Sequence, residues 1–137
     1  MLKNISRLLI IAGAVITVIA GVSLLVLGIV LLICGNLPAF QNFVIDGIEN
    51  GTFVTDLTGT SLEVAIQVQR SLSVLAIIFL VISIFCIASS ISSFLAQNSY
   101  NNKIHIINLV LSFCCENILS IAGSVILLIE NKNEKMD

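Results

Sequence analysis

Three long runs of apolar residues dominate the pattern of the chain. They extend over residues 8–34, 71–97 and 104–129, and Glu116 in the third run is the only Asp, Glu, Lys or Arg among them. A helix rises about 1.5 Å per residue, so about 20 residues are enough to cross the roughly 30 Å hydrocarbon core of a bilayer. The pattern therefore predicts an all-α integral membrane protein with three long transmembrane helices in a small bundle.

The segment between the first two runs, residues 35–70, is more polar. It contains the only Pro of the chain and four of its eight acidic residues, so we expect one partly helical extracytoplasmic loop. Thr60 and Glu63 have the spacing of a capping box, which predicts that a helix begins there and continues into the second run. Apolar residues at helical spacing also predict a short amphipathic helix. They are Phe40, Phe43, Val44 and Ile48.

The composition excludes several classes of protein. Apolar residues make up 58% of the 137 positions and charged residues 10%, and the mean hydropathy is +1.13. Soluble domains have roughly 25% charged residues, so this chain has too little charge to cover a surface in water. The net charge of −2 leaves no basic patch for phosphates. We expect the lipid bilayer of the cell membrane as the surroundings, and no nucleic-acid partner.

The topology of the third run has two interpretations. Length favours one crossing helix over 104–129, followed by a polar tail at 130–137. Charge favours a short hairpin broken at Glu116-Asn117, because it puts five of the six Lys and Arg residues on the cytoplasmic side instead of three. We predict the single helix, with the hairpin as the alternative and the amino terminus in the cytoplasm in both. The six cations are Lys3, Arg7, Arg70, Lys103, Lys132 and Lys135.

Small residues recur every seven positions in the first two runs. Small side chains let helix backbones approach closely in lipid, and this period keeps one face toward a partner helix. We expect the two faces to meet, while the spacing of Gly13, Thr17 and Gly21 alternatively favours a homodimer. The expected helix-packing residues are Gly13, Ala14, Gly21, Gly28, Ala76, Ser83, Ser90 and Gly123.

Polar residues recur every four positions in the third run, which places them on one face that we expect to point inward. An acid at mid-bilayer costs about 2.5–3.5 kcal/mol, so we expect a neutral Glu116 that donates a hydrogen bond to Ser83 or, second, to Thr17. Alternatively, Glu116-Asn117 marks a bend whose polar groups bond freed backbone groups. The candidate intramembrane polar site comprises Glu116, Ser83, Ser112, Asn108 and Ser120, with Ser124 on the same face.

No catalytic or metal-binding motif stands out. The four cysteines lie in or beside apolar runs, where Cys behaves as a small hydrophobe, and His105 has no second ligand at a suitable spacing. We therefore expect no enzymatic activity, no cofactor and no metal site. The cysteines are Cys34, Cys86, Cys114 and Cys115.

The order of segments carries a resemblance. The chain begins with a Gly-rich first run, an acidic outer segment, a second run and a short Asn/Lys turn. It closes with Ile118-Leu119-Ser120-Ile121-Ala122-Gly123, then Leu127-Leu128-Ile129 and a charged tail. This order resembles small uncharacterised multi-pass membrane proteins of low-GC Gram-positive bacteria. Their final apolar region is usually longer, with room for two helices. The resemblance implies a location in the cell membrane and no agreed activity.

These features predict a class of function rather than a process. We expect a non-enzymatic interaction or accessory component of a membrane complex, acting through a protein partner or as a homo-oligomer. Three helices enclose too little volume for a solute pathway. The alternative is therefore an oligomeric pore, a holin-like protein or a small transporter in which Glu116 lines the pathway.

Overall fold

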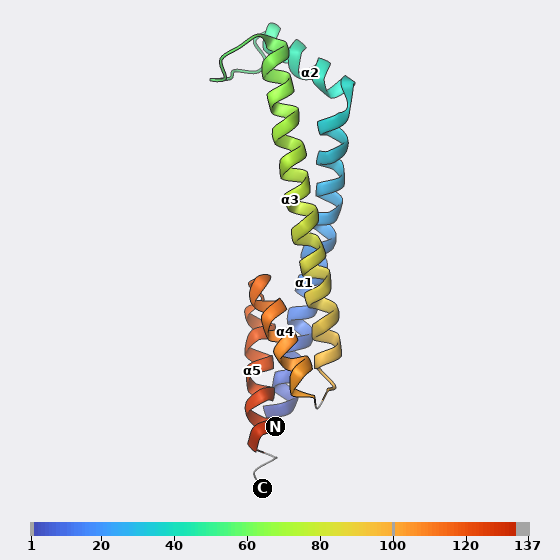
Figure 1. Ribbon diagram of the computed structural model, residues 1–137, viewed down its shortest axis with the longest axis vertical. Coiled ribbons are helices and arrows are strands. Elements are labelled where there is room, and N and C mark those ends of the chain that lie inside the picture. Colours follow the sequence, from blue (N-terminus) through green and yellow to red (C-terminus); the bar gives the residue numbers. More distant parts are fainter. Residues whose placement is uncertain (1, 100, 134–137) are drawn as a thin grey trace. The chain divides into compact units, whose positions relative to one another are not determined.

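All regular secondary structure in the described residues is helical (Figure 1). The computed structural model describes residues 2–99 and 101–133. The helices are α1 (Leu2–Asn36), α2 (Pro38–Glu49), α3 (Ser61–Ala96), α4 (Asn102–Cys114) and α5 (Ile118–Asn133). Within the described part of the chain, α1 and α3 are the two helices long and apolar enough to cross a membrane.

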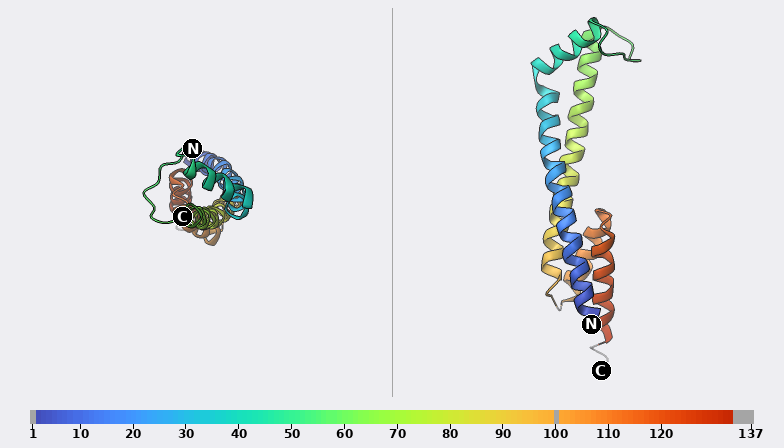
Figure 2. Two further views of the ribbon diagram at one scale, coloured as in Figure 1. Left: turned by 90° about the horizontal axis from the view of Figure 1, so that it is seen from above. Right: turned by 180° about the vertical axis from the view of Figure 1, so that it is seen from behind.

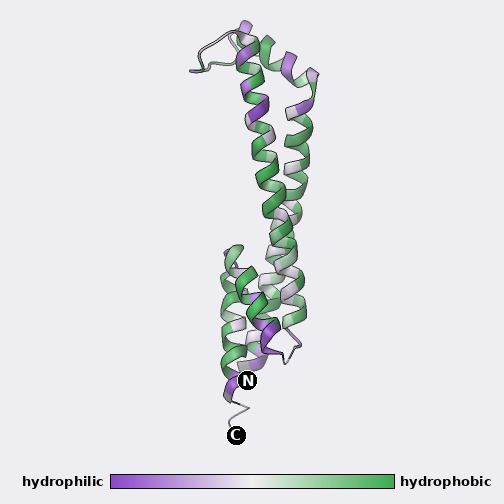
Figure 3. Cartoon of the chain, in the orientation of Figure 1, coloured by the Kyte–Doolittle hydropathy of each residue, from purple (hydrophilic) through white to green (hydrophobic). Residues whose placement is uncertain are grey.

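The chain divides into two compact units, which are described separately. The hairpin unit contains residues 1–24 and 82–137, and the loop unit contains residues 25–81. Figure 3 shows that apolar residues dominate both long helices, whereas hydrophilic residues gather on α2 and at the start of α3. This distribution agrees with the predicted contrast between the apolar runs and segment 35–70.

The single helix predicted over 104–129 is wrong, and the chain forms the alternative hairpin. α4 ends at Cys114, α5 begins at Ile118, and the two helices pack side by side in opposite directions (Figures 1 and 2). Their 13 and 16 residues rise about 20 and 24 Å, less than the roughly 30 Å of a hydrocarbon core. α5 continues to Asn133, so the predicted tail is helical at its start, and residues 134–137 lie outside the described residues.

The turn of the hairpin has a specific backbone geometry. Glu116 has a φ of +52°, in the left-handed region. The amide of Asn117 donates to the carbonyl of Ser112 at 2.8 Å, and the amide of Glu116 donates to the carbonyl of Phe113 at 3.2 Å. These two bonds form a Schellman motif, which ends a helix by satisfying its last carbonyls. The backbone therefore stops α4 four residues short of the next helix start.

The predicted helix starts in segment 35–70 are confirmed. The amide of Thr60 donates to Oε2 of Glu63 at 2.8 Å, and the amide of Glu63 donates to Oγ1 of Thr60 at 3.3 Å. This reciprocal pair is a capping box, and α3 begins at Ser61 directly after it. The amphipathic helix predicted around Phe40 is α2, which has Pro38 in its first turn, where a missing amide costs nothing.

Small residues lie where α1 meets α3 in each unit. In the hairpin unit, Oγ of Ser90 donates to the carbonyl of Ala14 at 2.9 Å, and a Cβ on Gly21 would lie 3.0 Å from Cβ of Cys86. In the loop unit, a Cβ on Gly28 would lie 3.0 Å from Cγ of Leu80. The absence of larger side chains allows these close approaches.

Two other glycines hold the hairpin against α1. A Cβ on Gly13 would lie 2.9 Å from the amide nitrogen of Ser120, and a Cβ on Gly123 would lie 2.7 Å from the carbonyl oxygen of Ser6. The face of Gly13, Thr17 and Gly21 is therefore used for packing within the hairpin unit. The alternative in which this spacing forms a homodimer does not fit that arrangement.

Candidate functional site

A buried network of polar side chains joins α3, α4 and α5 in the hairpin unit. Asn108 lies at its centre: its Nδ2 donates to Oγ of Ser124 at 2.7 Å and to Oγ of Ser120 at 3.1 Å. Its Oδ1 accepts a bond of 2.8 Å from Oγ of Ser93, and Ser112 donates to Ser120 at 2.9 Å. All five side chains are fully buried. The polar residues of the third run therefore turn toward one another, apart from Glu116.

The hydrogens of this network can be assigned by counting. A serine hydroxyl has one hydrogen, and Ser93 uses it on Asn108. In the 2.9 Å contact between Ser93 and Ser120, the donor is therefore Ser120. Ser120 then accepts two bonds and donates one. The network is a satisfied structural core, because little of its hydrogen-bonding capacity is left for a ligand.

Ser93 was missing from the predicted site. The signal for it is the run Ser89-Ser90-Ile91-Ser92-Ser93 near the end of the second apolar run, where four hydroxyls fall within five residues. Ser83, which was predicted, is buried on α3, ten residues before Ser93. The spacing of polar residues along one helix predicted the polar face of that helix. The residue on another helix that bonds this face could be identified only from the tertiary structure.

Asn117 joins the hairpin turn to α1. Its Oδ1 accepts a bond of 3.1 Å from the amide of Ser120, so Asn117 is the N-cap of α5. Its Nδ2 donates to Oγ1 of Thr17 at 2.6 Å, and Oγ1 of Thr17 donates to the carbonyl of Gly13 at 2.8 Å. Asn117 therefore has the role of the predicted bend residue, which bonds freed backbone groups.

Glu116 does not face the interior, which corrects the prediction. Its side chain is exposed at the turn, and its carboxyl group has no hydrogen bond or ion pair with any residue in 2–99 or 101–133. No bond joins it to Ser83, and Thr17 bonds Asn117 instead. The physical reason is the helix break, because the four-residue spacing keeps side chains on one face only while the helix continues.

The carboxyl group of Glu116 borders a shallow pocket in the hairpin unit. The pocket has a volume of about 210 Å³. It is lined by residues of α1, by one residue of α3, by the turn and by the start of α5: Ile16, Thr17, Ala20, Cys86, Cys115, Glu116, Asn117, Ile118 and Leu119. Pockets for drug-sized ligands span about 300–1,000 Å³, so this one suits a single side chain. The polar atoms of Thr17 and Asn117 are already bonded, which leaves the carboxyl group as the free polar group.

The cysteines and the histidine form no metal site among the described residues. All four cysteines are free thiols, and no group of three or more His, Cys, Asp or Glu residues could hold a metal ion there. His105 is fully buried, with Nε2 at 2.9 Å from the carbonyl of Ser99. It therefore fastens the turn before α4.

The chain matches no protein-family model, no curated protein and no solved structure. The resemblance to small membrane proteins of Gram-positive bacteria stays a prediction.

Proposed function

We propose that this chain is a non-enzymatic component of a membrane complex in the cell membrane. In this proposal α1 and α3 cross the bilayer, and the α4–α5 hairpin enters it from the cytoplasmic side without crossing. The distribution of cations supports this topology, because a hairpin leaves only Arg70 outside. Lys3, Lys103 and Lys132 stand near the helix ends away from the hairpin turn.

The contact with α1 supports a position of the turn near the middle of the bilayer. Asn117 bonds Thr17, which lies nine residues beyond Leu8, the start of the first apolar run. Nine residues of helix rise about 14 Å, close to half of the hydrocarbon core. Glu116, next to Asn117 and exposed, then meets acyl chains or another protein.

The main support for the proposal is that Glu116, the single acid at this depth, has no partner within the described chain. Such an acid costs about 2.5–3.5 kcal/mol, and a basic group from another chain offsets that cost. Among the described residues, a second copy offers no Lys or Arg at this depth, because Lys3, Arg7, Lys103 and Lys132 lie near the helix ends. The partner is therefore a different membrane protein with a Lys or Arg within a transmembrane helix.

Photo-crosslinking in native membranes tests this function. A photoreactive side chain replaces Ile118, which is 77% exposed beside Glu116, and the captured protein is identified by mass spectrometry. We expect a membrane protein with a basic residue inside an apolar helix, and we expect Glu116→Gln to abolish the capture. Glu130→Gln is the matched control, because it removes an acid near the end of α5.

Three results would count against the proposal. One is equal capture by wild type and Glu116→Gln, and another is crosslinking to lipid alone. The third is an ion conductance in reconstituted vesicles that depends on Glu116, which would favour the alternative of an oligomeric pore.

A further inference from the structure

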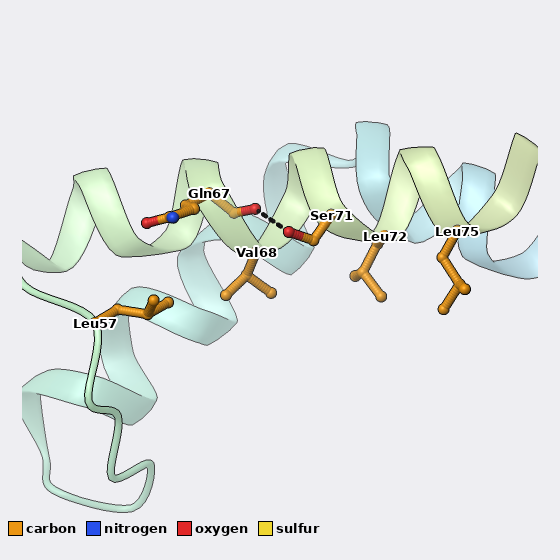
Figure 4. A pocket seen from close by; sticks show the side chains of 6 residues that line it. All are labelled: Leu57, Gln67, Val68, Ser71, Leu72 and Leu75. Atoms are coloured by element: carbon orange, nitrogen blue, oxygen red, sulfur yellow. Dashed lines mark hydrogen bonds between the residues drawn. The ribbon is translucent and has the colours of Figure 1, made fainter.

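The loop unit contains an apolar groove made of two hollows that share Val68. The first hollow, of about 260 Å³, lies between α2 and α3 and is lined by aliphatic residues and by Phe40, Phe43 and Phe53. The second, of about 240 Å³, lies under Leu57 of the connecting segment 50–60. Figure 4 shows Leu57 opposite Val68, with Leu72 and Leu75 following along α3.

The groove has the dimensions of a short helix. Its α3 wall extends from Val64 to Leu75, and eleven residues of helix rise about 16 Å, or three turns. The wall residues Val64, Val68 and Leu75 have the spacing of an apolar stripe on one face of a helix, and such a stripe packs against another helix. Phe40 and Phe43 close the upper end, with ring centroids 6.3 Å apart.

Apolar side chains in this unit are exposed outside the apolar runs. Phe43 is 59% exposed and Val54 is 94% exposed, and both belong to segment 35–70. Val64 also precedes Ser71, where the second apolar run begins. The groove therefore starts before the second apolar run and ends within it, which corresponds to the height of the lipid headgroups in the proposed topology. An apolar patch at such a polar surface marks an interaction site.

The charges around the groove indicate which kind of ligand it binds. The loop unit has four acids and one base, Arg70, which gives a net charge of −3 from residues 25–81. Asp56 stands between two lining residues, and Glu63 precedes Val64. Such a surface attracts cations and repels anions. The remaining two acids are Asp46 and Glu49 on α2.

We propose that this groove binds a cationic amphipathic helix of about three turns that lies on the outer membrane surface. The apolar face of the ligand fills the two hollows, and its Lys or Arg side chains face the acids of the loop unit. This mode is the placement of an amphipathic helix in a hydrophobic groove. The site is separate from Glu116, so it shares only the proposed membrane topology with the function above.

Binding of a designed peptide to the full-length protein tests the inference. The protein is placed in discs of phosphatidylcholine, and the probe is a fluorescent 14-residue helical peptide of Leu and Lys. A peptide with Glu at every Lys position is the control, and discs without protein give the lipid background. We expect the Leu/Lys peptide to bind the protein at least about tenfold more tightly than the Leu/Glu peptide, with weaker binding at high salt.

Three variants locate the binding. We expect Phe43→Ser to weaken binding of the Leu/Lys peptide about tenfold, because aromatic anchors dominate such interfaces, while Val54→Ser leaves it unchanged. Asp56→Asn, in an exposed segment that does not pack in the core, tests the charge without disturbing the fold. Equal binding of both peptides, binding equal to empty discs, or no effect of Phe43→Ser and Asp56→Asn would overturn the inference.

Discussion

The side chain of Asn117 donates a hydrogen bond of 2.6 Å to Oγ1 of Thr17 and at the same time caps α5 through the amide of Ser120. One residue therefore fixes both the start of α5 and the position of the hairpin turn against α1. Glu116, its neighbour, makes no comparable bond with its carboxyl group. At the turn, Asn117 therefore has a structural role, whereas the carboxyl group of its neighbour Glu116 is free.

Asn117→Ala is expected to destabilise the hairpin by about 2 kcal/mol, about 1 from the lost N-cap and about 1 from the lost interhelical bond. Asn117→Ser keeps a hydroxyl as the cap acceptor but lacks the side-chain amide that donates to Thr17, so a smaller loss is expected. Thermal unfolding in detergent measures both, and Ser23→Ala, at an exposed hydroxyl on α1, is the control. If the Ala and Ser23 variants behave alike, the turn does not depend on Asn117.

Glu116→Gly is expected to leave the hairpin as stable as wild type or to stabilise it by about 1 kcal/mol. The left-handed conformation at φ +52° costs a residue with a Cβ about 1–2 kcal/mol and costs glycine little. The same unfolding measurement applies. A clear loss of stability would mean that the carboxyl group supports the fold, contrary to its exposed and unbonded position.

Asn108→Val is expected to cost about 2–3 kcal/mol, because it leaves the buried hydroxyl of Ser124 without its partner and removes the acceptor to which Ser93 donates. Hydrogen exchange measured by mass spectrometry should then rise in α4 and α5. A matched change, Val110→Asn, adds a polar group at an exposed position of α4 and tests whether polarity alone alters exchange. Unchanged exchange in Asn108→Val would contradict a structural role for the network.

Gly13→Ala is expected to loosen the packing of the hairpin on α1, since a Cβ there meets the backbone amide of Ser120 at 2.9 Å. Gly28→Ala should cost less, because the nearest atom belongs to the Leu80 side chain, which can rotate. The comparison uses the melting temperature of the two variants in the same detergent. Equal losses would show that the contact with the hairpin backbone is not special.

The hairpin also predicts where the carboxyl end of α5 lies in the membrane. A cysteine at Lys132 in a chain without its four native cysteines should react with a membrane-impermeant maleimide only after the membrane is opened. A cysteine at Thr55 should react in intact cells, because the proposed topology places segment 35–70 outside. Labelling of Lys132→Cys in intact cells would overturn the proposed topology.

Local chemistry made much of the fold predictable. The capping box at Thr60 and Glu63 needs only residues three positions apart, and the apolar runs of α1 and α3 need only their own composition. The polar face of Asn108 and Ser112 followed from helical spacing because those residues share one helix. Ser93 was not predicted, because its bond to Asn108 joins two helices.

The sequence by itself determined the two long apolar helices, the more polar segment 35–70 between them and the small residues along α1, because solvent preference and helix propensity act residue by residue. Only the tertiary structure decided that residues 104–129 form two helices. A break within an apolar run is favourable only if the freed groups find partners, and the partner of Asn117 is Thr17, 100 positions earlier in the chain. The same break turned Glu116 outward, since a side chain keeps its helical face only as far as its helix extends.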